Sequence, residues 1–239
     1  MKETRIFQLQ IGNEEQLATK NLVEGTKTHK EKTVIVNGEE FLEWNPYKSK
    51  LAAAIRNGLQ ILPIIKNSKI VCISPLEEST ILHISNIVGN GGSVFVIIVD
   101  KNKKSFLNKL VDTHKNIIPI YDTVDELSSS SITGKVDALY VDIPESEQIE
   151  MIVKKYGSLL KNDGFLMLIV KKDDNAIIEK DIAGWMAEQR AGLNKVREIT
   201  TKLKSQFEII QEINLGISYA MEPYHKFHTF ILAQFLNKN

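Results

Sequence analysis

The chain has 239 residues, which suits one large domain or a domain with a small appendage. Hydrophobic residues make up 43% of it and charged residues 25%, values that exclude a mostly disordered or fibrous protein. Thirty Lys and Arg balance thirty Asp and Glu. Proteins that hold nucleic acid alone by neutralising phosphates usually carry a basic excess, so any such role must be local or shared with partners.

Cysteine content and apolar patterning bear on the compartment. The single cysteine, Cys72, has no internal disulfide partner, which indicates a reducing environment. The first residues, MKETRIFQLQIGNEEQ, lack the apolar core of a signal peptide, and the longest apolar runs are of strand length, too short to span a bilayer. We therefore expect a cytoplasmic protein with no membrane contact, and we predict no metal site.

Residues 1–48 predict a small antiparallel β-sheet domain. Three segments alternate in polarity as strands do: Arg5–Ile11, Thr33–Val36 and Glu40–Trp44. Asn37-Gly38, between the last two, is a typical hairpin turn. Ser49–Leu59 is then expected to form a helix leading into a main domain of residues 49–239.

From Lys69 onward, short apolar runs alternate with helical segments. Five runs have the length and β-branched content of buried strands: Lys69–Ser74, Ser93–Asp100, Asn116–Tyr121, Asp137–Ile143 and Gly164–Lys171. Three intervening segments space their apolar residues as helices do: Leu76–Val88, Lys103–His114 and Ser146–Leu160. This alternation predicts a parallel sheet covered by helices on both faces.

The C-terminal part follows a different pattern. A long helical pattern over Ala176–Lys204 precedes two apolar segments, Phe207–Leu215 and His228–Phe235, whose connection shows no helical periodicity. The two segments should therefore pair antiparallel at the sheet edge. Together these features predict an α/β fold with a seven-stranded, Rossmann-like sheet closed by an antiparallel hairpin. Such sheets bind ligands at the carboxyl ends of their strands, near the switch in strand order.

Seven segments, spread over nearly the whole chain, resemble the motifs of one family in their order. They are Thr19–Gly25 (TKNLVEG), Glu43–Ile55 (EWNPYKSKLAAAI), His83–Gly89 (HISNIVG), Asn116–Ile120 (NIIPI), Leu139–Ile143 (LYVDI), Gly164–Lys171 (GFLMLIVK) and Met221–His228 (MEPYHKFH). This set resembles the archaeal fibrillarin-like RNA 2′-O-methyltransferases. The resemblance implies a class I methyltransferase fold with S-adenosylmethionine as methyl donor. It also implies work in a box C/D guide-RNA particle, where a scaffold protein holds the enzyme over guide and target RNA.

The resemblance further implies four residues of catalytic type. The family's Lys–Asp–Lys–His group matches Lys50, Asp142, Lys171 and His228. Cations and a carboxylate can orient a ribose hydroxyl and accept its proton. Taken singly, each residue has an ordinary alternative as a solvated lysine, a helix-capping aspartate or a structural histidine. The ordered set within matching motifs favours the catalytic interpretation.

The positions that match the family's glycine-rich cofactor turn depart from it. The family's Gly-Ala-Ala-Ser-Gly-Thr-Thr matches SPLEEST, in which Ser74 and Glu78 replace the two glycines. Pro75 removes a backbone donor, and Glu77 and Glu78 add negative charge where the methionine carboxylate would lie. The letters SPLE form a capping box with proline at the first helical position, which predicts that Ser74 caps the following helix.

Two further cofactor positions differ. The glutamate that holds the ribose hydroxyls in the family matches Ile98, with Asp100 two residues later, and the aspartate near the adenine matches Thr123, with Asp122 adjacent. Each lost charged hydrogen bond is worth about 1.5–3 kcal/mol. Losing two would weaken binding by about 100-fold or more. We therefore predict a non-catalytic fibrillarin-like paralogue that binds no cofactor. The alternative is an active S-adenosylmethionine-dependent methyltransferase with an atypical pocket.

The predicted partners are the scaffold protein of the particle, guide and target RNA, and either an active fibrillarin paralogue or a second copy of the chain. Lys50 and Lys171 could be retained because they contact RNA phosphate. Residues 172–206 form a longer segment than in typical members. An amphipathic helix packed on the sheet is the favoured use of it, and a partner-binding helix carrying Trp185 and Met186 is the alternative.

Overall fold

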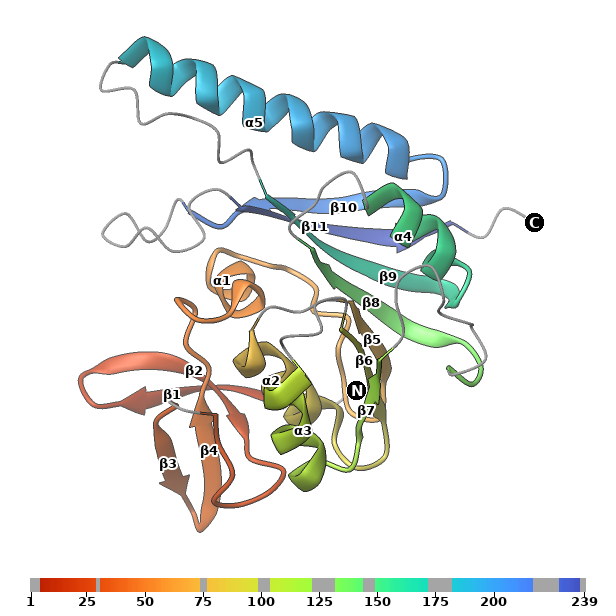
Figure 1. The fold of residues 1–239 in the computed structure, drawn as a ribbon. Helices are drawn as coiled ribbons and strands as arrows, with labels where there is room; N and C mark the ends of the chain where they lie inside the picture. Colours follow the sequence, from red (N-terminus) through yellow and green to blue (C-terminus); the bar gives the residue numbers. More distant parts are fainter. Residues whose placement is uncertain are drawn as a thin grey trace.

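The computed structural model describes residues 5–28, 31–73, 77–98, 104–121, 132–143, 149–171, 182–216 and 228–236 (Figure 1). Two β-sheets organise them: a four-stranded antiparallel sheet near the N-terminus and a seven-stranded mixed sheet (Figure 1). Among the described helices, none combines the length and the hydropathy needed to cross a bilayer.

The small sheet has the strand order β1-β2-β4-β3. Its strands are β1 (Ile6–Ile11), β2 (Glu14–Lys20), β3 (Thr33–Val36) and β4 (Glu39–Glu43). Asn37 and Gly38 have φ angles of 52° and 81°, as a two-residue hairpin turn requires, so the predicted hairpin is confirmed. Strand β2 is missing from the sequence-based prediction because it begins with charged residues. The Gly12-Asn13 pair before it, with Gly12 at φ 68°, is the turn signal that could have revealed it.

The large sheet has the order β10-β11-β9-β8-β5-β6-β7. Its strands are β5 (Lys69–Ile73), β6 (Ser93–Ile97), β7 (Ile117–Ile120), β8 (Val136–Asp142), β9 (Leu160–Lys171), β10 (Phe207–Asn214) and β11 (His228–Phe235). Strands β5 to β9 pair in parallel, whereas β11 runs antiparallel to both β9 and β10. The predicted seven-stranded sheet with an antiparallel C-terminal pair is therefore confirmed. Strand β9 starts four residues before the predicted Gly164.

Helices cover both faces of the large sheet (Figure 1). They are α1 (Lys50–Arg56), α2 (Glu78–Val88), α3 (Lys104–Thr113), α4 (Ile149–Gly157) and α5 (Ile182–Leu203). The first three, together with the small sheet, share one hydrophobic core with the large sheet, and α4 and α5 share a second core on its other face. Along α5, Val196, Ile199 and Leu203 follow helical spacing and are buried in the second core, which confirms the predicted amphipathic helix. The side chains of Trp185 and Met186 lie outside the described residues.

Buried polar contacts attach the small sheet to α2. The hydroxyl of Thr19 lies 2.8 Å from Nδ1 of His83 and accepts a hydrogen bond from Nδ2 of Asn86 at 3.1 Å. Oδ1 of Asn86 accepts from the backbone N–H of Leu22 at 3.0 Å. The ring of Trp44 stacks on His83 with 4.9 Å between centroids. These contacts join two of the motif segments: TKNLVEG, which begins at the end of β2, and HISNIVG, which lies on α2. The division into residues 1–48 and 49–239 stays a prediction.

Candidate functional site

Three of the four catalytic-type residues lie at one end of the large sheet. Asp142 ends β8, Lys171 ends β9, and His228 begins the antiparallel strand β11. Lys171 is directly opposite His228, and Asp142 pairs with Ile169, two residues before Lys171. Side chains of paired strands alternate between faces, and Ile169 belongs to the core below α1 and α2. Asp142, Lys171 and His228 therefore share that face of the sheet.

The fourth residue, Lys50, reaches the same place from a helix. It is the first residue of α1, which Ser49 caps by accepting a hydrogen bond from the backbone N–H of Ala52 at 3.2 Å. Nζ of Lys50 is 2.8 Å from Oδ2 of Asp142. Both residues are buried, at 4% and 2% exposure. The ordinary alternative of a solvated lysine at a helix start is thereby excluded.

A second carboxylate, that of Glu77, also holds Lys50. Its Oε1 lies 3.1 Å from the Lys50 Nζ. Its Oε2 accepts hydrogen bonds from the backbone N–H of Lys50 at 3.0 Å and from the hydroxyl of Thr80 at 2.9 Å. Oγ1 of Thr80 lies 2.8 Å from Oγ of Ser49. The Lys50 ammonium is thus held between two carboxylates, in a cluster that joins α1, α2 and β8.

This arrangement corrects the predicted capping box. Helix α2 begins at Glu78 with Glu77 as its N-cap, so the helix does not start at Ser74. The Glu77 side chain makes no capping hydrogen bond to α2. The physical reason is competition: a hydrogen bond to an ammonium is about twice as strong as one between neutral groups, and Glu77 reaches the ammonium of Lys50. Ser74 and Pro75 lie outside the described residues.

The protonation of Lys50 follows from these neighbours. Burial lowers the pKa of Lys50, but the carboxylates of Glu77 and Asp142 raise it, and the net pKa lies above the ordinary 10.5. Lys50 is therefore an ammonium at neutral pH and can donate hydrogen bonds but accept no proton. Among the described groups of this cluster, the carboxylates of Glu77 and Asp142 are the ones whose chemistry suits them to receive a proton from a hydroxyl.

Two of the predicted cofactor positions, Ile98 and Glu78, lie in the described part of the chain, one in the protein interior and the other at a helix start. Ile98 follows β6 and is 4% exposed in the core shared with α1 and α2. Glu78 is the first residue of α2, where its charge complements the helix dipole. Ser74, Asp100, Asp122 and Thr123 lie outside the described residues, so the interpretation of these four stays a prediction. Within the described ranges, no cluster of His, Cys, Asp or Glu is arranged to hold a metal.

The contribution of Glu77 to the Lys50 cluster is the feature that sequence reasoning misses. The sequence places Glu77 directly before a helix, and such an acidic residue ordinarily serves the amides of its own helix. Nothing in the spacing shows that the first turn of α1, which lies 27 residues earlier, packs against it. Thr80 and Ser49 are missed for the same reason.

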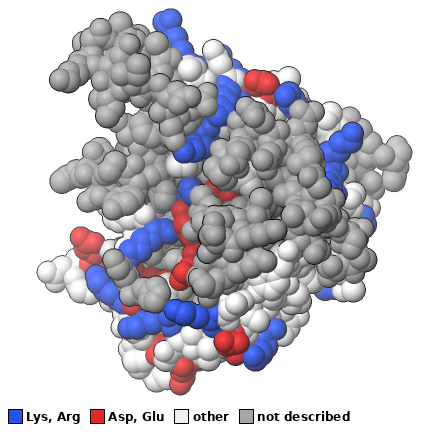
Figure 2. All heavy atoms as spheres, viewed as in Figure 1, with Lys and Arg blue, Asp and Glu red and all other residues white. Residues whose placement is uncertain are grey.

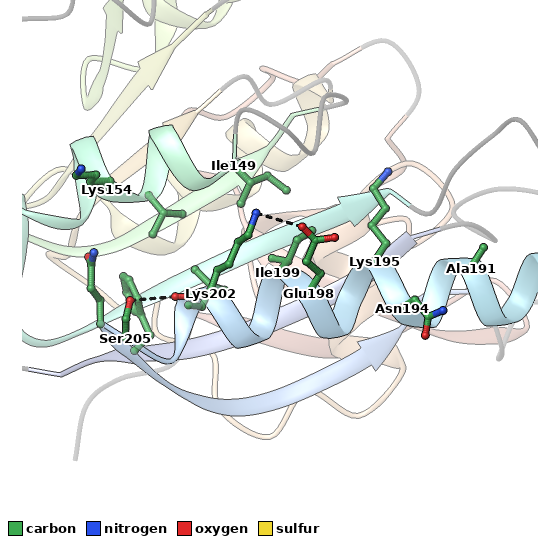
Figure 3. A pocket seen from close by; sticks show the side chains of 13 residues that line it. Ile149, Lys154, Ala191, Asn194, Lys195, Glu198, Ile199, Lys202 and Ser205 are labelled. Atoms are coloured by element: carbon green, nitrogen blue, oxygen red, sulfur yellow. Dashed lines mark hydrogen bonds and ion pairs between the residues drawn. The ribbon is translucent and has the colours of Figure 1, made fainter.

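A separate cavity of about 590 Å³ lies between α4 and α5, on the other face of the sheet (Figure 3). Val153, Ile199 and Phe207 contribute apolar side chains to its lining, and Lys202 and Glu198, which pair at 3.1 Å, also line it. None of the four catalytic-type residues lines it. On the face drawn in Figure 2, the described basic side chains lie among acidic ones, in keeping with the zero net charge.

A sheet of this order has an aspartate, a lysine and a histidine at its strand ends and a second lysine that reaches the aspartate from α1, and it defines a protein with the class I methyltransferase fold. Comparison with known proteins then shows the family. The fibrillarin family model matches residues 1–237, and this chain belongs to the fibrillarin family. The fibrillarin-like rRNA/tRNA 2′-O-methyltransferase of Pyrobaculum aerophilum is 31% identical, over 92% of this chain and 88% of that protein.

Solved structures agree with this assignment. The fibrillarin of Methanococcus jannaschii, a pre-rRNA processing protein, is 28% identical with a TM-score of 0.76, over 98% of this chain and 99% of that one. The fibrillarin of Aeropyrum pernix, solved with natively bound S-adenosyl-L-methionine, is 25% identical with a TM-score of 0.72, over 95% and 92% of the two chains. A fibrillarin in complex with Nop5p, 24% identical over 98% of both chains with a TM-score of 0.73, shares the fold.

Proposed function

We propose that this chain is a component of box C/D guide-RNA particles that acts in rRNA or tRNA 2′-O-methylation without binding S-adenosylmethionine itself. Membership of the fibrillarin family over residues 1–237 supports the place in the particle. The observation that carries the non-catalytic part is the engagement of Lys50 by Glu77, at 3.1 Å from Nζ and 3.0 Å from the backbone N–H. With this role we propose a cytoplasmic location, as the lone Cys72 suggests.

The described residues around the cofactor positions do not fit S-adenosylmethionine. A helix N-terminus attracts a carboxylate through its free N–H groups and its dipole, and the start of α2 would offer this to the methionine end of the molecule. Here Glu78 is the first residue of that helix, and its charge repels a carboxylate. The side chain of Ile98, buried at 4% exposure, has no polar atom to accept hydrogen bonds from ribose hydroxyls. Two of the expected interactions thus have no counterpart among the described residues.

The second candidate function is an active methyltransferase with an atypical pocket. One observation favours it: Asp142, Lys171 and His228 share a face of the sheet, and Asp142 lies 2.8 Å from Lys50. In such an arrangement, the Asp142 carboxylate could accept the proton of a hydroxyl that the lysines orient. Asp100 and Asp122 would then have to supply the missing contacts to the cofactor.

For partners, we propose the scaffold protein of the particle together with guide and target RNA. A fibrillarin of the same fold that has been solved with Nop5p supports the protein partner. Of the two lysines considered for RNA contact, Lys50 is buried between carboxylates and does not present its ammonium to a phosphate. Lys171 is only half-buried at the end of β9 and is the better candidate. An active paralogue or a second copy remains part of the proposal as a further partner.

Isothermal titration calorimetry with S-adenosylmethionine tests the non-catalytic role. The isolated chain and the chain bound to its scaffold protein are titrated separately. We expect a Kd weaker than about 1 mM in both, which corresponds to less than about 4.1 kcal/mol of binding free energy. Micromolar binding would overturn the proposal, and guide-directed methyl transfer in a reconstituted particle would establish the second candidate in its place.

A further inference from the structure

We infer that Glu77 is a positioning residue that fixes the ammonium of Lys50 beside Asp142 and ties the start of α1 to the start of α2. The inference deepens the proposed function, on which it rests, by giving the retained Lys50 a structural use. In the sequence, Glu77 is notable only as part of the segment SPLEEST, which departs from the family's cofactor-binding turn; the inference gives this residue a structural role.

The geometry of one carboxylate carries the inference. Glu77 has extended backbone angles, φ −120° and ψ 114°, and its side chain makes no hydrogen bond to an amide of α2. Its two oxygens instead serve three donors: the ammonium of Lys50, the backbone N–H of Lys50 and the hydroxyl of Thr80. The side chains of Glu77 and Lys50 are 15% and 5% exposed, so water competes little for these contacts.

Helix α1 has a specific need for this carboxylate. It is a helix of seven residues with no acidic residue in its first turn. Ser49 satisfies the backbone N–H of Ala52, and Glu77 satisfies that of Lys50 from the neighbouring element. Glu77 therefore supplies through space the negative charge that a helix start favours, which the sequence of α1 itself lacks.

Every ionisable group of the cluster contributes to the state of Lys50. Glu77 precedes α2, and Asp142 ends β8. Tyr140 also lies on β8, and burial, followed by the charges of Asp142 and Glu77, raises its pKa well above 10, so it stays neutral. The Lys50 ammonium is the only cation among these described groups, and it faces two carboxylates. Removing the charge of Glu77 takes away one of the two carboxylates that contact the Lys50 ammonium and should make Lys50 easier to deprotonate.

The test is the pKa of Lys50, measured in the full chain by NMR of its labelled ε-carbon, with amide hydrogen exchange at its backbone N–H. In Glu77→Gln the pKa should fall by about one unit, a tenfold change in the protonation constant, because the charge is lost. The amide should stay protected, since the glutamine oxygen still accepts its hydrogen bond. In Glu77→Ala both the high pKa and the amide protection should be lost. Glu198→Gln, which removes the same charge from the exposed pair with Lys202, is the control and should change neither.

An unchanged Lys50 pKa in both Glu77 variants would overturn the inference. Should Glu77→Ala fail to fold, Glu77→Asp serves instead: it keeps the charge one methylene short, so the pKa should stay high while amide protection falls. Protection equal to that of the wild type in Glu77→Asp would count against the inference. The result is separate from the titration with S-adenosylmethionine, because that ligand could bind the wild-type chain whether or not Glu77 sets the pKa of Lys50.

Discussion

The two sides of the candidate site differ in what their residues contact. On strands β8, β9 and β11, Asp142, Lys171 and His228 share one face of the sheet. On the side of β5, β6 and α2, Glu77 and Ile98 are engaged with the protein itself. The comparison teaches that contacts from outside a motif, such as those of Glu77 to Lys50, decide what a residue of catalytic type touches. The sequence motifs group Lys50 with Asp142, Lys171 and His228, whereas its contacts with Glu77 join it to the side of α2.

Removing the cation shared by the two sides should have the largest effect. Lys50→Met leaves the Glu77 and Asp142 carboxylates, which are 15% and 3% exposed, without the cation that both contact. Breaking a buried ion pair in this way costs about 3–5 kcal/mol of unfolding free energy, measured by urea denaturation. Lys202→Met, which removes the cation of an exposed pair with Glu198, is the matched control and should change the unfolding free energy by less than about 1 kcal/mol. If Lys50→Met lost no more unfolding free energy than Lys202→Met, the contacts among Lys50, Glu77 and Asp142 would not stabilise the fold as proposed.

Acid should weaken the attachment of α2, the helix that forms the second side. Burial lowers the pKa of His83 to about 3, although a backbone hydrogen bond raises it slightly. The folded state therefore favours neutral His83, and this stability is present above the ordinary pKa of 6.5 and lost as the pH falls toward about 3. The loss is about 1.4 kcal/mol per pH unit within that window.

His83→Gln removes the titrating group, so the variant should lose stability less steeply than the wild type between pH 6.5 and about 3. Urea denaturation at a series of pH values measures both slopes. Equal slopes would show that His83 becomes protonated without unfolding, contrary to its burial beside Trp44.

The link from Ser49 to Thr80 tests the contact between the sides more gently. Ser49→Ala removes the cap of α1 and the hydroxyl that lies 2.8 Å from Thr80. Loss of such a cap costs about 1 kcal/mol, measurable by thermal or urea unfolding. Ser49→Thr keeps a hydroxyl and should recover most of the loss. Equal losses in the two variants would point to packing around the side chain in place of the hydrogen bond.

The smallest effect should come from Lys171, on the side of β8, β9 and β11, through an electrostatic contact with RNA. Lys171→Ala should lower RNA affinity in the assembled particle and reduce the slope of log affinity against log salt by about 1, because one phosphate contact is lost. Lys154→Ala, on the other face of the sheet, is the control and should leave the slope unchanged. The same slope in both variants would remove Lys171 from the RNA-binding surface.

Much of this fold could be predicted from the sequence because apolar runs and turn residues act locally. The segment His228–Phe235 is the observed strand β11, and Asn37-Gly38 makes the predicted turn. Strand β2 escaped prediction because its partners β1 and β4, and not its own polarity, place it in a sheet. The site divides in the same way. Motifs place Asp142 at a strand end, whereas the task of Glu77 depends on how two helices pack, which residue order alone does not specify.

Helix α2 lies between the two sheets, and every residue from Ser79 to Val88 is buried. Its surface is thus shared by both parts of the molecule, so neither part could lose the other without exposing an apolar helix to water. Heating or denaturant should consequently melt the two sheets together, in one cooperative event with a single midpoint. Deleting the N-terminal strands should leave an insoluble protein, because α2 would lose the small sheet against which it packs and would expose apolar side chains to water.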